Sequence, residues 1–288
     1  MTTLHSLLPR IHVHPILMVF IVISFLTGTF VELAAILSIV FFHELGHYTV
    51  AKLFKWRVES IILWVFGGIM ETDEHGNRPV REEALVTLAG PMQHVFIYIF
   101  IYIVSTFHLF PESIVELLMY YNTVILLFNL VPIWPLDGGK LLFLFLTSFL
   151  PFKRAYYSVL VFSMASSFAL LLAVLLFYPF TLSIFLIWLF LLMENRTEWK
   201  QRHFVFLRFL LKRYEGNNPV KAVQPIHVTS DSTFMDVFSE FMRDRKHSIY
   251  ISYPDARRSL MDENDCLKSY FHDRLYDKRI GEAMDYVF

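Results

Sequence analysis

The sequence predicts an α-helical membrane protein with about six spans, a small membrane-associated β-hairpin and a soluble α/β domain at its C-terminal end. Of its 288 residues, 56% are hydrophobic and 18% are charged, against about 45–50% and about 25% in average globular chains. The charges divide unevenly: residues 1–195 hold 9 Lys/Arg and 12 Asp/Glu, and residues 196–288 hold 16 and 14. An apolar body is therefore followed by a charged tail.

Net charge and cysteine content argue against a nucleic-acid-binding protein and a disulfide-stabilised protein. The formal net charge of −1 gives no reason to expect direct binding to nucleic acid. Cys266 is the one cysteine of the chain, which excludes an internal disulfide framework.

Residues 1–195 contain the expected membrane spans. A spanning helix needs roughly 17–25 mostly apolar residues. The last apolar stretch is too long for one span, and Tyr178-Pro179 divides it in two because proline cannot continue a helical hydrogen-bond ladder. The six candidates lie in Pro15–Val31, Leu33–Ala51, Ala84–Pro111, Leu117–Leu136 and the two halves of Ala155–Met193.

The basic residues between these spans predict their orientation. Lys and Arg occur between the second and third spans, between the fourth and fifth, and after the sixth, and the other three connections contain none. Because cytoplasmic loops carry the excess of Lys and Arg, both termini are expected on the cytoplasmic side.

Arg57–Met70 is rich in apolar and β-branched residues and contains Gly67-Gly68. This pattern predicts one or two strands with a glycine bend. Two interpretations stay open: an ordinary cytoplasmic hairpin, or an edge strand that pairs with an extended substrate.

The tail is expected to begin with a juxtamembrane helix and linker over residues 196–222, followed by a small domain over residues 223–288. Strands are expected at Ile226–Val228 and Ile249–Tyr253. One helix is expected after Ser232 or Thr233, which are good N-cap residues, and a second over Asp262–Phe271.

The most specific motif is His43-Glu44-Leu45-Gly46-His47. Residues four apart share one face of a helix, so both imidazoles can bind one metal ion, and Glu44 can act as a base for water. Ionisable groups inside a span are costly and usually mark a functional site. The alternative is a buried polar pair that links helices.

A catalytic zinc ion usually has three protein ligands, and Asp137 is the best candidate for the third. It lies in a segment with Pro132, Pro135 and two glycines, which prevent a regular helix. A turn-capping role is the alternative for Asp137. His94 stays open as another third ligand, a partner of a ligand or an ordinary interior histidine.

Asn129 could donate a hydrogen bond to a substrate carbonyl or an oxyanion, or it could form a polar contact between helices. At the level of function, two alternatives to an enzyme remain. One is a metal-ion transporter with a cytoplasmic regulatory domain, and the other is an inactive scaffold.

At these residues the chain resembles the site-2 protease family of intramembrane metalloproteases. HELGH fits the family's first motif, and the segment from Asn129 to Gly138 fits its second. The resemblance implies one Zn²⁺ per chain held by His43, His47 and Asp137, with Glu44 as the base. It also implies that Asn129, Pro132 and Pro135 shape substrate binding. We expect a substrate segment to unwind and pair near Phe66, Gly67 and Gly68.

Further stretches are similar to the sporulation proteases of this family. They are IHVHP, FGG, EHGNRP, AGPMQH, NLVPIWPLDGGKLL and QRH. This narrower resemblance implies cleavage of a membrane-associated sigma-factor precursor near the cytoplasmic boundary of the membrane. It also implies inhibitory or regulatory membrane proteins as partners, and a location in the outer forespore membrane facing the mother-cell cytoplasm.

Residues 223–288 resemble a single cystathionine-β-synthase-type (CBS) domain. Asp265 matches the acid that contacts the ribose of ATP or another adenine nucleotide in that family, whereas Asp262 replaces a hydroxyl residue and would repel phosphate. Such modules normally act in pairs, which implies a homo-oligomer or a partner. The alternative is a domain that docks substrate or stabilises the body.

Overall fold

The computed structural model divides into two compact units. The first contains residues 1–75, 81–141 and 181–187, and the second contains residues 76–80, 142–180 and 188–288. The structure describes residues 10–64, 67–72, 74, 76, 78–177, 179–216 and 222–287.

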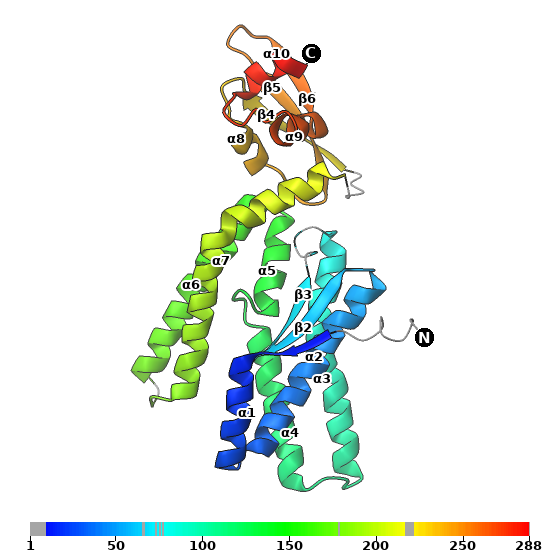
Figure 1. Cartoon of the computed structure of the whole chain (residues 1–288), viewed down its shortest axis with the longest axis vertical. Helices are drawn as coiled ribbons and strands as arrows, with labels where there is room; N and C mark the ends of the chain where they lie inside the picture. The colour runs from blue at the N-terminus through cyan, green and yellow to red at the C-terminus, as the bar shows by residue number, and fades with distance from the viewer. Residues whose placement is uncertain are drawn as a thin grey trace. The chain divides into compact units, whose positions relative to one another are not determined.

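The first unit contains several helices and one small sheet, which lies toward one end of them (Figure 1). Gly28 adopts the left-handed conformation with φ of 78° and ends α1, so the expected first span stops before Val31. The helices are α1 (Pro15–Thr27), α2 (Phe30–Leu53), α3 (Val80–Thr106), α4 (Glu112–Asn129) and the start of α5 (Asp137–Thr147).

Among the described residues, α2, α3 and α6 (Phe152–Phe177) are long and apolar enough to cross a membrane, and α1 is a shorter apolar helix. Large apolar side chains such as Phe100 and Phe168 are exposed on them, at 53% and 61%. A contiguous apolar exterior of this kind suits contact with lipid. The expected count of six spans stays a prediction.

The sheet of the first unit has the order β1-β2-β3. β2 (Val58–Trp64) and β3 (Gly67–Thr72) form the antiparallel hairpin expected from Arg57–Met70. β1 (Arg10–Val13) pairs in parallel with β2. β3 is therefore an edge strand. Phe66, expected to contact substrate, lies outside the described residues.

An apolar cluster attaches the hairpin to the helices. Its buried members come from α2, β2, β3, α3 and the link after α2, and they are Tyr48, Ala51, Trp56, Ile61, Met70 and Val86. Ala51 and Ile61 have no exposed surface. Burying these side chains fixes the sheet against the C-terminal half of α2, and a fully buried side chain of this kind contributes about 1.5–3 kcal/mol.

In the second unit, α6 and α7 (Leu182–Tyr214) lie side by side (Figure 1). The ring of Phe152 stacks on that of Phe209 with centroids 4.1 Å apart, and Tyr156 donates a hydrogen bond of 2.6 Å to Glu198. α7 passes residue 195 without a break. The last expected span and the juxtamembrane helix are therefore one continuous helix, because no proline or glycine interrupts it.

The C-terminal part of the second unit contains a sheet of order β4-β5-β6. β4 (Ala222–Thr229) pairs in parallel with β5 (Arg245–Ser252), which pairs antiparallel with β6 (Arg258–Asp262). The helices are α8 (Phe234–Ser239), α9 (Glu263–Phe271) and α10 (Ile280–Val287).

Two of these helices begin at the cap residues expected from the sequence, and the third helix was not expected. Thr233 forms a complete capping box with Asp236 at the start of α8, and Asp262 caps α9. The last helix, α10, has no counterpart in the sequence expectations.

A buried ion pair ties the last turn of α7 to this domain. Arg213 donates from Nε and Nη2 to the two carboxylate oxygens of Glu263, at 2.7 and 2.8 Å. Glu263 also accepts from the backbone N–H and the Nδ1 of His247, at 2.8 and 2.9 Å. Burial by itself would raise the pKa of Glu263, but the hydrogen bonds from His247 and Arg213 and the Arg213 charge hold that pKa at about 2.

The buried pair predicts a stability effect that Cys266 can report. Cys266 is fully buried, and burial raises the pKa of its thiol, so a maleimide modifies it only when the domain opens. Arg213→Ala removes the permanently charged partner of the buried Glu263 carboxylate, which costs about 3–5 kcal/mol. We therefore expect labelling of Cys266 in the full-length chain to accelerate by roughly a hundredfold or more.

The matched control for this measurement is Lys246→Ala. Lys246 pairs with Asp262 at 3.0 Å, and both side chains are about 40% exposed, so its loss changes stability by at most about 1 kcal/mol. Equal labelling rates in the two variants would show that the buried pair does not hold the domain closed.

Candidate metal centre

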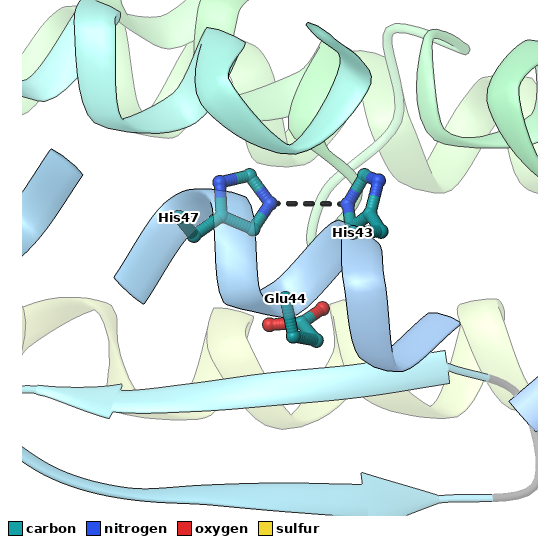
Figure 2. Close-up of side chains that lie close together, drawn as sticks. All are labelled: His43, Glu44 and His47. Carbon is teal, nitrogen blue, oxygen red and sulfur yellow. Dashed lines mark hydrogen bonds between the residues drawn. The ribbon is translucent and has the colours of Figure 1, made fainter. Parts of the chain in front are cut away.

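His43 and His47 project from one side of α2 toward each other (Figure 2). Their Nε2 atoms are 3.0 Å apart, and the two residues are 3% and 5% exposed. The four-residue spacing places both rings on one face of the helix, as expected from the motif.

Asp137, at the start of α5, lies against the two histidines. Its Oδ2 atom is 3.1 Å from the Nε2 of His43 and 3.2 Å from the Nε2 of His47. Its other oxygen, Oδ1, is 3.4 Å from the Nζ of Lys140. The structure therefore brings the three predicted ligand side chains together from two distant parts of the sequence.

The turn between α4 and α5 delivers Asp137 by unusually close backbone packing. A Cβ atom on Gly138 would lie 2.3 Å from the carbonyl oxygen of Leu130, and one on Gly139 would lie 2.5 Å from the carbonyl carbon of Ile133. Pro132 and Pro135 lie in the same turn. Only glycine permits these approaches. Gly138 and Gly139 lie inside the first turn of α5, so the expectation that they prevent a regular helix was wrong, and their role is to allow this close packing.

The hydrogen bond between His47 and Val86 indicates that this cluster binds a cation. His47 Nδ1 is 2.8 Å from the backbone oxygen of Val86, and a carbonyl only accepts, so in a neutral ring the hydrogen is on Nδ1 and Nε2 has a lone pair. That lone pair faces Asp137 Oδ2, a buried atom with no hydrogen-bond partner. Two buried electron pairs 3.2 Å apart need a cation between them.

Zinc fits this set of donors. It prefers imidazole nitrogen and carboxylate oxygen at about 2.0–2.2 Å in tetrahedral geometry, which places two ligand atoms about 3.4 Å apart. The three separations here are 3.0, 3.1 and 3.2 Å. With these three side chains as its ligands, a zinc ion would keep a fourth position for water or substrate.

Glu44 points away from the two imidazoles, toward the sheet (Figure 2). One carboxylate oxygen still lies within 4.8 Å of a ring nitrogen of both histidines. A Cβ atom on Gly68 would lie 2.2 Å from the Cγ of Glu44. β3 therefore reaches Glu44 because Gly68 has no side chain, and this explains one of the two predicted glycines. Gly67, the other, adopts φ of 151° where β3 begins.

α3 approaches the other side of the cluster in the same way. A Cβ atom on Gly90 would lie 2.3 Å from His47 Nε2 and 2.7 Å from His43 Nε2. A Cβ atom on Gly46 would lie 2.5 Å from the backbone oxygen of Ala89. Sequence reasoning missed this role of Gly90. Small residues at helix contacts within membranes were the available indication.

The other predicted residues lie at different places. Asn129 donates 3.0 Å to the backbone oxygen of Ile125 in its own helix. His94 contacts His43 Nδ1, on the far side of that ring from Asp137. Asp265 lies in the first turn of α9. Asn122, which sequence reasoning missed, contacts His94. A buried amide within an apolar span was the sign that could have identified it.

Comparison with known proteins gives consistent matches. Residues 31–111 and 107–176 match the description Peptidase family M50. The chain is 40% identical to stage IV sporulation protein FB of Bacillus subtilis, over 97% of this chain and 96% of that protein. It is 29% identical to a zinc metalloprotease of Methanocaldococcus jannaschii, over 74% of this chain and 60% of that protein.

A solved structure also matches. The site-2 protease from Methanocaldococcus jannaschii aligns with a TM-score of 0.55 and 26% sequence identity, over 65% of this chain and 89% of that chain. The chain is therefore similar to this protein in fold as well as in sequence.

Two glycine substitutions should separate metal binding from the rest of the site. Gly90→Ala places a methyl group against both Nε2 atoms, so we expect zinc affinity of the purified chain to fall by about tenfold or more. Gly68→Ala crowds Glu44 instead and should leave bound zinc unchanged. Metal analysis of both proteins checks this, and equal zinc content in both would contradict the geometry.

Proposed function

The chain belongs to peptidase family M50 and is a site-2 type zinc metalloprotease of the membrane, and we propose that it cleaves a membrane-associated sigma-factor precursor. The observation that carries the assignment of residues is the meeting of His43, His47 and Asp137 within 3.2 Å beside Glu44. We assign His43, His47 and Asp137 as the zinc ligands and Glu44 as the general base.

The positions of these residues indicate the chemical role of each. Bound zinc supplies Lewis acidity, which polarises a carbonyl and lowers the pKa of water toward about 7. The two imidazoles and Asp137 would hold the ion, and Lys140 contacts the other oxygen of Asp137, which orients the carboxylate. Glu44 takes a proton from the attacking water and passes it to the nitrogen of the leaving peptide.

The free edge of β3 is the proposed site for an extended substrate segment. An edge strand offers unpaired backbone N–H and C=O groups, which bind a peptide by strand addition. Strand addition here would place the peptide beside Glu44, because Gly68 lets β3 approach that side chain. Phe66, Gly67 and Gly68 are the residues that we assign to this contact. We also assign Asn129, Pro132 and Pro135 to substrate binding.

The similarity to stage IV sporulation protein FB over nearly the whole chain supports a role in sporulation. We propose that the enzyme lies in the outer forespore membrane with both termini on the mother-cell side. There it would cut near the cytoplasmic boundary and be restrained by other membrane proteins. The alternative, metal-ion transport with a regulatory tail, has no observation in its favour.

The three-part division of the chain stays a prediction, and α7 crosses its first boundary as a continuous helix. The CBS-type interpretation of residues 223–288 also stays a prediction. The same holds for self-association through that domain and for an adenine nucleotide at Asp265.

Two substitutions test the assigned roles. Glu44→Gln removes the base and keeps the side-chain shape, so zinc should remain while cleavage of a tagged sigma-factor precursor falls by about a hundredfold to ten-thousandfold. Asp137→Ala removes a ligand, so zinc and cleavage should both fall. Bound metal and product are measured on purified protein, with Glu112→Gln, an exposed residue at the start of α4, as control. Retained cleavage by Glu44→Gln would refute its role.

Disulfide cross-linking tests the pairing with β3. In a Cys266→Ser background, Glu71→Cys on β3 is combined with single cysteines along the substrate near the cleaved bond. A paired strand should cross-link at alternate substrate positions, because successive side chains point to opposite faces. Ile11→Cys, an exposed position on β1 at the other edge of the sheet, is the control. An equal pattern at both edges would contradict pairing with β3.

A further inference from the structure

Asn122 of α4 has a fixed amide orientation. It is fully buried, and its Nδ2 donates 3.2 Å to the backbone oxygen of His94. Because that carbonyl can only accept, the amide nitrogen must face it. The Asn122 oxygen is thereby directed at the Nδ1 of His94, 2.7 Å away.

The orientation of Asn122 in turn fixes His94. An amide oxygen can only accept a hydrogen bond, so His94 Nδ1 must carry the hydrogen. A neutral imidazole carries one hydrogen, which leaves a lone pair on His94 Nε2. His94 is fully buried, and this Nε2 lies 3.1 Å from the Nδ1 of His43.

We propose that Asn122 and His94 are positioning residues that hold His43 in the tautomer that binds metal. The lone pair on His94 Nε2 requires a hydrogen on His43 Nδ1, and His43 Nε2 is then free to donate its electron pair toward the site shared with His47 and Asp137. This inference rests on the proposed function, because it concerns the same zinc site.

His47 needs no such relay. Its Nδ1 donates directly to the backbone oxygen of Val86, which no side-chain substitution removes. The orientation of His43 is encoded by two side chains, so it can be tested by substitution. Partners of metal-bound histidines of this kind typically change metal affinity by about tenfold to a hundredfold when they are removed.

The test measures metal binding by the full-length chain, independently of cleavage. His94→Phe keeps a ring and removes the acceptor, and Asn122→Leu keeps the approximate shape and removes the amide. We expect both variants to bind zinc about tenfold to a hundredfold more weakly in chelator competition. The visible absorption of the Co²⁺-loaded protein should also change. His94→Gln, whose oxygen can accept from His43 Nδ1, should restore part of the affinity.

The matched control is Tyr98→Phe. Tyr98 and Thr123 join the same two helices through a hydroxyl pair of 2.8 Å, close to His94 but without contact to His43. This variant should bind zinc as the wild type does. If it loses as much affinity as His94→Phe, the effect comes from the packing of α3 against α4, and the proposal fails.

The remaining outcomes separate this proposal from the proposed function. Wild-type affinity and an unchanged Co²⁺ spectrum in both His94→Phe and Asn122→Leu would overturn the relay, while zinc-dependent cleavage by the wild type would still stand. A wild-type chain that binds no zinc would overturn the proposed function and the relay together. Should His94→Phe not fold, Asn122→Leu and His94→Gln decide the same question.

Discussion

The site depends on one constraint: electron pairs from several residues converge in one buried place. His47 Nε2 and Asp137 Oδ2 face each other at 3.2 Å, and the hydrogen of His47 is already used on Val86. Such an arrangement is costly inside a membrane protein unless a cation occupies it. The helices, the hairpin and the turn before α5 are arranged so that these groups meet.

Close backbone approach is what makes the convergence possible. On one side of α2, Gly90 lets α3 lie against both imidazole rings, and on the other, Gly68 lets β3 lie against Glu44. Gly138 lets the turn before α5 fold tightly enough to bring Asp137 in. Each contact leaves less room than a methyl group needs. The turn of α2 that carries His43, Glu44 and His47 is therefore enclosed by α3 and β3.

The convergence of the residues that we assign to chemical roles was predictable, because their spacing is local or their residue type is rare in the membrane region. His43 and His47 share a helix face, and Asp137 is one of two aspartates before residue 196. What escaped prediction depends on contacts across the fold. The strand β1 pairs with β2, which lies more than forty residues later in the chain. The role that we propose for Asn122 depends on its contact with His94. The continuity of α7 was hidden because its charged second half looked like a separate element.

α4 contributes to the site twice, although it supplies no ligand itself. Asn122 is fully buried and orients His43 through His94. The turn that follows α4 carries Asp137. A displacement of α4 would therefore alter the tautomer of one ligand and the position of another at the same time. His47, in contrast, is held by the backbone of α3. The metal centre thus couples α2 to both neighbouring helices by different means, one through backbone and one through side chains.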